Sequence, residues 1–206
     1  ISIRGTYADR SGKITLMEDG ILIAPAPYAA SSAYYFPTTG RLAGVEILKG
    51  PSAITQGPYT VGGAINFLST LIPHVSSGMI NQELGKDGTS RTHFHYGGVG
   101  DNAAFLIESH MWNSDGFDSI KGSSEDTGLD KDDIVVKLRL NSDANSDGVY
   151  HELNIKYQDS EESSNQTYVG LADPDFRIDA HSRYGLTAYD NMDNSHDTTS
   201  INYIVD

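Results

Sequence analysis

One stretch near the middle of the chain carries the clearest structural signal: Ile134-Val135-Val136-Lys137-Leu138-Arg139-Leu140-Asn141. The apolar side chains at even positions share one face, and Lys137, Arg139 and Asn141 share the other. Such alternation is typical of a β-strand with one apolar face and one polar face. The same period recurs at residues 91–96, 103–112, 149–158 and 201–205, and more weakly at 78–85. An antiparallel sheet is therefore predicted for this half of the chain.

The lengths of these segments and of their connections distinguish two kinds of sheet. The segments are about 8–11 residues long, which suits a tilted strand that crosses a bilayer better than an ordinary soluble strand of about 5–6 residues. Short turns at 97–101 and 142–148 alternate with long acidic loops at 113–131 and 159–196. Short turns at one end and long loops at the other favour an outer-membrane β-barrel. A soluble antiparallel β-sandwich alternates in the same way and is the alternative.

The composition limits the classes of partner and of chemistry. The chain has 206 residues, a formal net charge of −14 and no cysteine. An acidic balance argues against a nucleic-acid partner, because phosphate binding needs a basic face. Without cysteine the chain has no disulfide, no thiolate metal ligand and no cysteine nucleophile. No apolar run reaches the roughly 18 residues of a transmembrane helix.

Charge divides the chain into two regions. Residues 1–75 contain five basic and four acidic residues, whereas residues 76–206 contain nine basic and 24 acidic ones. Six of the seven prolines lie in the first region, and residues 71–78 have the composition of a connector. A change this abrupt predicts two regions with different surroundings.

The first region is predicted to be a small α+β module. Short strands are expected at 14–17, 21–23, 45–48 and 62–68, with a short helix beginning at Pro51. The loop from Ala24 to Thr39 contains four aromatic residues among small ones: Tyr28, Tyr34, Tyr35 and Phe36. These rings are expected either to pack against the module or to form a ligand-facing surface, since tyrosine offers rigid contact area and a hydroxyl.

The motifs that carry catalysis or metal binding are missing or explained by turns and strands. Asp143 to Gly148 match the start of a calcium-binding loop, but Asn154 stands where the bidentate glutamate is needed, so a turn is predicted. His93 and His95 share one strand face and are interpreted as a solvated pair that faces a lumen. No pair of carboxylates with a supporting base is found, so we predict no catalytic residue, no metal site and no enzyme activity.

Three stretches together resemble the plug domain of TonB-dependent outer-membrane receptors. These are Ile1-Ser2-Ile3-Arg4-Gly5, Asp19-Gly20-Ile21-Leu22-Ile23, and the run from Val45 to Ile54 that continues through Gly57-Pro58 and Gly62-Gly63-Ala64-Ile65-Asn66-Phe67. Their order and spacing also match that family. Ala24 to Tyr28 and Tyr168 to Phe176 are similar to the ferric-dicitrate receptor branch.

The resemblance implies a domain organisation. Residues 1–72 would be the C-terminal part of a plug, and residues 76–206 would be about six strands of an antiparallel transmembrane β-barrel. The predicted fold class is thus an α+β plug followed by a partial barrel, mainly β. A plugged transporter barrel has about 22 strands, so we expect the sequence to be an internal fragment.

The resemblance also implies roles for individual residues. Ligand contacts are expected at the plug apex, from Tyr28, Ser31, Ser32, Tyr34 and Tyr35, and in an external loop, from Tyr168, Arg177 and Arg183. Plug–barrel ion pairing is expected from Arg4 and Lys49, and hinge bends from Gly50, Gly57, Gly62 and Gly63.

The function that follows is uptake of a ferric chelate, of the siderophore or ferric citrate type, across the outer membrane of a Gram-negative bacterium. The expected partners are TonB, outer-membrane lipid and the chelate, which is a transported ligand and not a resident cofactor. Two alternatives stand beside it: a soluble acidic β-sandwich that binds carbohydrate or protein, and an enzyme on a β scaffold.

Overall fold

The computed structural model describes residues 3, 5, 11–23, 35–143 and 148–206. The chain divides into two compact units, Ile1–Leu71 and Ile72–Asp206. None of the helices within the described ranges combines the length and the apolar character that a bilayer crossing needs.

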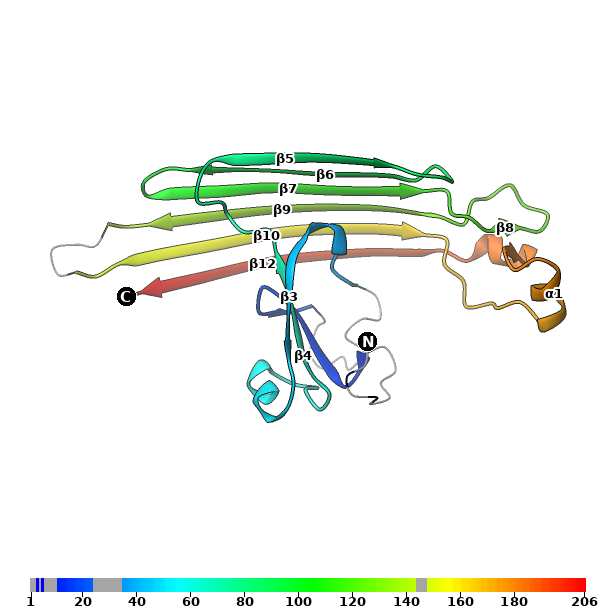
Figure 1. Ribbon diagram of the computed structural model, residues 1–206, viewed down its shortest axis with the longest axis horizontal. Helices are drawn as coiled ribbons and strands as arrows, with labels where there is room; N and C mark the ends of the chain where they lie inside the picture. Colours follow the sequence, from blue (N-terminus) through cyan, green and yellow to red (C-terminus); the bar gives the residue numbers. More distant parts are fainter. Residues whose placement is uncertain (1–2, 4, 6–10, 24–34, 144–147) are drawn as a thin grey trace. The chain divides into compact units, whose positions relative to one another are not determined.

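A four-stranded sheet forms the first unit, in the order β2-β1-β4-β3 (Figure 1). Its strands are β1 (Ile14–Glu18), β2 (Ile21–Leu22), β3 (Leu42–Leu48) and β4 (Gly63–Ser69). β1 and β4 run parallel, and the other neighbours are antiparallel. Two 3₁₀ helices, η2 (Thr39–Arg41) and η3 (Pro51–Gln56), complete the described part of the unit. The expected strands and the short helix after Pro51 are confirmed.

A tight turn joins β1 to β2 where the sequence predicted one. Asp19 has a φ of 49° and Gly20 a φ of 81°. Two successive left-handed residues match the right-handed twist of the strands they connect, and aspartate and glycine tolerate that conformation best.

The central strands of the first unit are buried on both faces. One face packs into a cluster of apolar residues with Phe36 and Leu42 at its edge: Ile3, Ile14, Leu16, Ile23, Tyr35, Ile65 and Phe67. The other face packs Met17 and Ala64 against Ala53 of η3. Burial on two sides explains why apolar residues lie on both faces of β1 and β4, without strict alternation.

The second unit is a six-stranded antiparallel meander in the order β12-β10-β9-β7-β6-β5 (Figure 1). The strands are β5 (Ser77–Leu84), β6 (Ser90–Val99), β7 (Ala103–Ser114), β9 (Leu129–Asn141), β10 (His151–Ser164) and β12 (Met192–Val205). All six alternating segments predicted from the sequence are strands of this sheet.

Several strands extend further into the acidic segments than the alternation indicated. β10 continues to Ser164, and β12 already begins at Met192. The expectation that Asp159–Glu162 is a solvated loop is therefore wrong, because β10 pairs with β9 and with β12 along that stretch. Ladder hydrogen bonds do not depend on side chains, so a strand can continue where its apolar pattern has ended.

The two long connections at one end of the sheet are shorter than expected and partly ordered into elements. Residues 115–128 contain β8 (Ser119–Ile120). Residues 165–191 contain α1 (Asp173–Ile178), β11 (Ser182–Arg183) and η4 (Gly185–Tyr189). β8 and β11 pair in parallel, so the two loops are joined by backbone hydrogen bonds.

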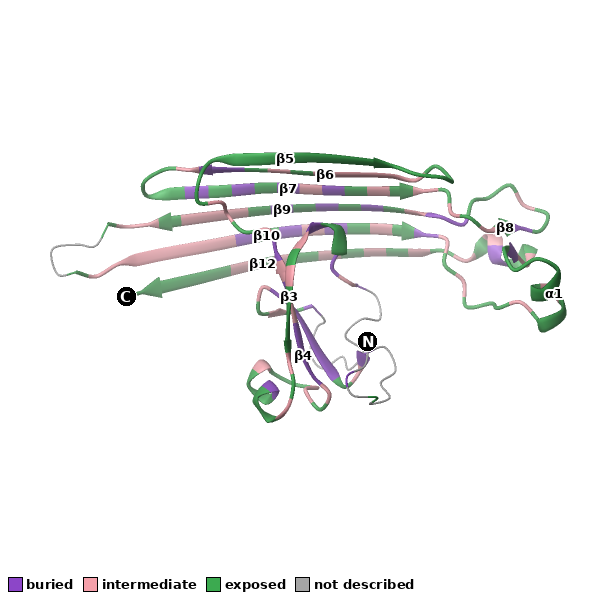
Figure 2. Ribbon diagram, in the orientation of Figure 1, coloured by how far each residue is buried: buried purple, intermediate pink, exposed green. Residues whose placement is uncertain are grey.

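Exposed and buried residues alternate along the central strands of the meander (Figure 2), so its two faces differ in exposure. We call one of them the apolar face. Twelve of its large side chains are 37–73% exposed: Ile80, Phe94, Tyr96, Phe105, Ile107, Met111, Ile134, Val136, Leu140, Tyr157, Ile201 and Tyr203.

We call the opposite side of the meander the polar face. Charged and amide side chains at its centre are buried, with Glu108 fully buried and Asp133 and Gln158 each 1% exposed. This distribution inverts that of a soluble protein, in which charged groups are almost never fully buried unless paired and large apolar patches are rarely exposed.

Candidate functional site

A buried ion pair lies in the first unit, in contact with Tyr35 near the end of the loop from Ala24 to Thr39, which we call the aromatic loop. Arg41 holds Glu18 through two hydrogen bonds, Nη1 to Oε1 at 2.8 Å and Nη2 to Oε2 at 3.0 Å. The Tyr35 hydroxyl lies 3.5 Å from Glu18 Oε2 and 3.4 Å from Arg41 Nη2. A two-pronged guanidinium–carboxylate pair is the geometry that best offsets the cost of burying both charges.

The position of Tyr35 differs from the expected ligand-facing one. Its side chain is buried in the main cluster of the first unit, and its hydroxyl is directed to the ion pair. In the described structure Tyr35 anchors the end of the aromatic loop to β1 and η2. The other expected apex residues, Tyr28, Ser31, Ser32 and Tyr34, lie outside the described residues, and their ligand contacts stay predictions.

The two residues expected to form plug–barrel ion pairs are described only in part. Lys49 is exposed at the end of β3, and Arg4 lies outside the described residues. The ion-pairing role of both stays a prediction.

The four expected hinge glycines occupy conformations or spaces that other residues tolerate poorly. Gly50 and Gly57 flank η3 with φ values of 93° and 110°. A Cβ at Gly62 would lie 3.0 Å from the Lys13 carbonyl oxygen. Gly63 has a φ of 135°, and a Cβ there would lie 2.6 Å from the Leu48 carbonyl oxygen. Tight packing therefore accounts for Gly62 and Gly63, and a hinge role is a separate prediction.

Replacing Gly63 with alanine is expected to destabilise the protein by about 1–3 kcal/mol, because the added carbon meets backbone and the φ is left-handed. Gly44→Ala is the matched control, since its Cβ would make only an ordinary 3.6 Å contact with Leu68; we expect a change within about 0.5 kcal/mol. Denaturant unfolding of the full-length protein measures both. Equal losses at the two positions would contradict the packing account.

The two joined loops at the end of the sheet are also held by side chains. Arg183 donates from Nε to Asp118 Oδ2 at 2.9 Å and from Nη1 to the Asn165 carbonyl at 2.6 Å. The Tyr184 hydroxyl donates to Asp175 Oδ2 at 2.6 Å. Residues 115–128 and 165–191 therefore form one small platform.

A groove of about 430 Å³ opens in this platform. Asp118, Gln166 and Arg183 contribute polar wall, and Val169, Leu171 and Phe176 contribute apolar wall. Of the expected loop residues, Arg183 lines this groove, whereas the Tyr168 side chain is 93% exposed. Arg177 is also exposed and pairs within α1, Nε to Asp173 Oδ2 at 2.9 Å. Ligand binding by these three residues stays a prediction.

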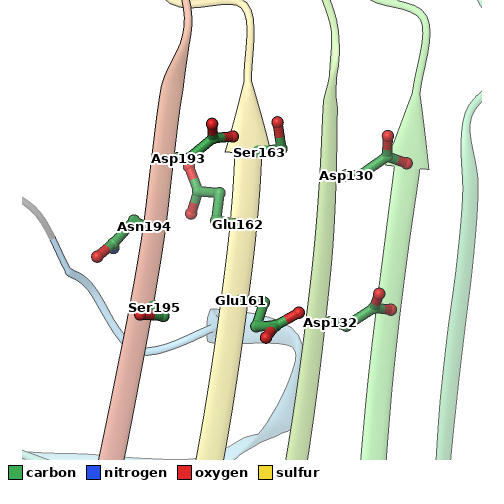
Figure 3. A pocket seen from close by; sticks show the side chains of 8 residues that line it. All are labelled: Asp130, Asp132, Glu161, Glu162, Ser163, Asp193, Asn194 and Ser195. Carbon is green, nitrogen blue, oxygen red and sulfur yellow. The ribbon is translucent and has the colours of Figure 1, made fainter.

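A second groove, of about 360 Å³, lies where β9, β10 and β12 approach the same loops. Its walls carry Asp130, Asp132, Glu161, Glu162 and Asp193, together with two serines and an asparagine (Figure 3). Asp132 and Glu161 lie directly opposite each other on neighbouring strands, an arrangement that costs free energy through like-charge repulsion. Within the described ranges, no group of three or more His, Cys, Asp or Glu side chains is arranged to hold a metal ion. The carboxylates that line the groove therefore make the electrostatic potential of this surface negative, and no metal site is assigned to them.

On the polar face, histidines and paired charged side chains of neighbouring strands lie in contact with one another. His93 Nε2 lies 2.8 Å from Glu108 Oε1, and its ring centroid is 5.8 Å from that of His95 and 5.7 Å from that of His110. On the same face, Lys131 Nζ of β9 lies 3.1 Å from Glu162 Oε2 of β10. The predicted sharing of one face by His93 and His95 is confirmed, and register adds His110, the direct neighbour of His93. His151 lies apart and stacks on Tyr203.

No family model matches the chain, but solved structures do. The ferric citrate transporter FecA, in its unliganded form, matches with a TM-score of 0.75 and 22% sequence identity over 98% of this chain. The siderophore receptor PirA from Acinetobacter baumannii matches with a TM-score of 0.61 and 15% identity over 98% of this chain. The ferripyoverdine receptor of the outer membrane of Pseudomonas aeruginosa matches with a TM-score of 0.52 and 20% identity over 72%. The chain has the fold of these receptors.

The chain spans only part of that receptor fold. It covers 30% of the FecA chain, 31% of the PirA chain and 19% of the ferripyoverdine receptor. The part that it covers is a small mixed sheet followed by a long antiparallel meander.

Sequence reasoning missed the residues whose partners are distant along the chain. Glu18 and Arg41 are separated by 23 residues, and Asp118 and Arg183 by 65. No local pattern marks either pair. The one signal in the sequence is the position of Glu18 at the end of the largely apolar segment Ile14–Met17. A charged residue that is buried with such a segment requires a partner.

Proposed function

We propose that this chain is part of a TonB-dependent outer-membrane receptor that takes up a ferric chelate. Residues 1–71 would belong to the plug, and residues 72–206 would supply strands of the surrounding barrel. The observation that carries the proposal is the inverted meander, whose apolar face is exposed and whose polar face is buried.

The inverted meander suits a sheet with lipid on one side and a hydrated lumen on the other. In a β-sandwich the apolar faces of two sheets pack against each other. The apolar face here contains Phe94, Ile107 and Ile134, each exposed by more than a third. The observation therefore favours the barrel over the soluble sandwich.

The connections of the meander also support a barrel, and they indicate which end of the sheet would face the outside of the cell. Residues 85–89, 115–128 and 165–191 join strands at one end of the sheet, whereas residues 100–102 and 142–150 join strands at the other. Longer loops on the outer side and shorter turns on the periplasmic side are usual in such barrels. The platform of residues 115–128 and 165–191 would then face the outside of the cell.

Transport in this proposal requires no covalent chemistry. The chelate would bind to the outer loops and to the apex of the plug, and TonB would pull on the plug to open a path along the polar face. The paired charges of that face, such as Lys131 with Glu162, would line a hydrated passage. Arg4 and Lys49 would hold the plug by ion pairs with the barrel.

The proposal is tested by fractionation and uptake with the full-length protein. In iron-limited cells the protein is expected in the outer-membrane fraction, and uptake of at least one radiolabelled chelate from a panel of ferric siderophores and ferric citrate should stop when TonB is deleted. Recovery of the protein in the soluble fraction, or the same uptake without TonB, would contradict the proposal.

A further inference from the structure

The groove between the outer loops is lined by side chains of two kinds. Val169, Leu171 and Phe176 are apolar, and Asp118, Gln166 and Arg183 are polar. Its volume of about 430 Å³ lies within the range of small-molecule sites. A ligand that fills this groove needs an apolar segment beside a group that accepts hydrogen bonds.

The cations of the platform are all engaged by carboxylates. Arg183 is bound to Asp118 at 2.9 Å, Arg177 to Asp173 at 2.9 Å, and Lys121 Nζ lies 3.8 Å from Asp175 Oδ1. Each pair cancels one positive charge, so these groups offer little net attraction to an anion. Arg177 and Arg183, from which ligand contacts were expected, therefore add little net positive charge to the platform.

The remaining charge of the platform is negative. Against the three cations, residues 115–128 and 165–191 contain eight carboxylates: Asp115, Asp118, Glu125, Asp126, Asp173, Asp175, Asp179 and Asp190. The acidic groove of β9, β10 and β12 adds four more beside the same loops, Asp130, Asp132, Glu161 and Asp193, since its fifth carboxylate, Glu162, pairs with Lys131. Charges that line one side of a site set the potential felt by an approaching ligand, so this surface repels polyanions.

Arg183 still offers hydrogen-bond donors to the groove. Among the described residues its hydrogen bonds come from Nε and Nη1, and a guanidinium has five N–H donors. The N–H groups of Nη2 are therefore open to a ligand acceptor such as a hydroxamate or amide oxygen. Because Asp118 balances the charge of Arg183, an uncharged acceptor suits this position.

We propose that this groove selects a ferric chelate of the hydroxamate type, neutral or cationic and carrying an aliphatic arm, over polyanionic chelates such as ferric citrate. Hydroxamate donors neutralise the ferric ion, whereas citrate and catecholate donors leave an excess of negative charge. The aliphatic arm would lie along Val169, Leu171 and Phe176, and a hydroxamate or amide oxygen would accept from Arg183 Nη2. This inference rests on the receptor function proposed above.

Equilibrium binding to the full-length receptor tests the selection with three probes: a cationic linear ferric trihydroxamate, ferric dicitrate and a ferric tricatecholate. Calorimetry is expected to show the trihydroxamate binding at least about tenfold more tightly than either anion. The preference should widen at low ionic strength, because screening weakens. Equal or tighter binding of ferric dicitrate or of the tricatecholate would overturn the selection and leave the receptor function standing. If none of the three binds, the selection is overturned, and the uptake experiment with the wider panel decides the receptor function separately.

Two substitutions test separately the net charge of the platform and the apolar lining of the groove. Asp173→Asn, at a side chain that is 73% exposed, is expected to tighten ferric dicitrate and to weaken the cationic trihydroxamate, each about two- to fivefold. Asp101→Asn is the matched control, because it makes the same change in an exposed turn at the other end of the sheet; neither affinity should change. Leu171→Ser should weaken the trihydroxamate alone. Affinities that respond equally to Asp173→Asn and Asp101→Asn, or that ignore Leu171→Ser, would overturn the assignment of this groove.

Discussion

Replacing Ile107 with arginine is expected to destabilise the full-length receptor in a lipid bilayer by about 2–4 kcal/mol, the cost of a charged side chain at the middle of a lipid-facing strand. Ile107 lies centrally on β7, between Tyr96 and Val136 of the neighbouring strands. Its side chain is 45% exposed. In water an arginine at such a site would cost almost nothing, because its charge would stay hydrated. The substitution therefore reports which solvent the apolar face meets.

Leu186→Arg is the control for this experiment. Leu186 is 59% exposed and lies in η4 of the outer loops. Both the membrane barrel and the soluble sandwich place this residue in water, so we expect a change within about 0.5 kcal/mol. Urea unfolding of protein refolded into phospholipid vesicles measures both variants. If Ile107→Arg costs no more than Leu186→Arg, the apolar face does not meet lipid, and the main support for the membrane receptor is lost.

Replacing Arg41 with methionine is expected to destabilise the protein by about 3–5 kcal/mol. The substitution leaves the carboxylate of Glu18 buried without the guanidinium that pairs with it, which is the costly way to break a buried ion pair. Arg41 is 1% exposed and Glu18 5% exposed, so water does not replace the lost partner. Removing both charges in Glu18→Gln/Arg41→Met should recover much of the loss.

Lys49→Met provides the comparison for Arg41→Met, since it removes a cation from an exposed position in the same unit. Denaturant unfolding of the full-length protein is the measurement, and the Lys49 variant should stay within about 0.5 kcal/mol of the parent. A double variant as unstable as Arg41→Met alone would show that lost packing, and not a stranded charge, accounts for the effect.

The strands of the meander were predictable where their two faces differ in polarity. Ile134 to Asn141 alternate strictly, and the strand and its faces follow from that period. The continuation of β10 through Asp159 to Ser164 was not predictable, because its ladder hydrogen bonds to β9 and β12 leave no trace in side-chain polarity. For the same reason the acidic loops were expected to be longer than they are.

Register also lies beyond a one-dimensional pattern. The period of two places His93 and His95 on one face, but the position of His110 directly opposite His93 depends on how β6 and β7 align. The same limit applies to the platform, where β8 and β11 pair although some 60 residues separate them along the chain. A pattern along the chain reports which way a side chain faces and contains no information about which strand lies beside it.

The sequence pattern alone was enough to predict the division near residue 71, the six amphipathic strands, the tight turn at Asp19-Gly20 and the resemblance to the receptor plug. Each of these depends on neighbours within one element, so the chain encodes it directly. The Arg41–Glu18–Tyr35 contact, the pairing of Arg183 with Asp118 and the exposure of the apolar face emerged only once the strands were assembled. These features join residues brought together by backbone pairing, and their free energy depends on burial, which no single element possesses alone.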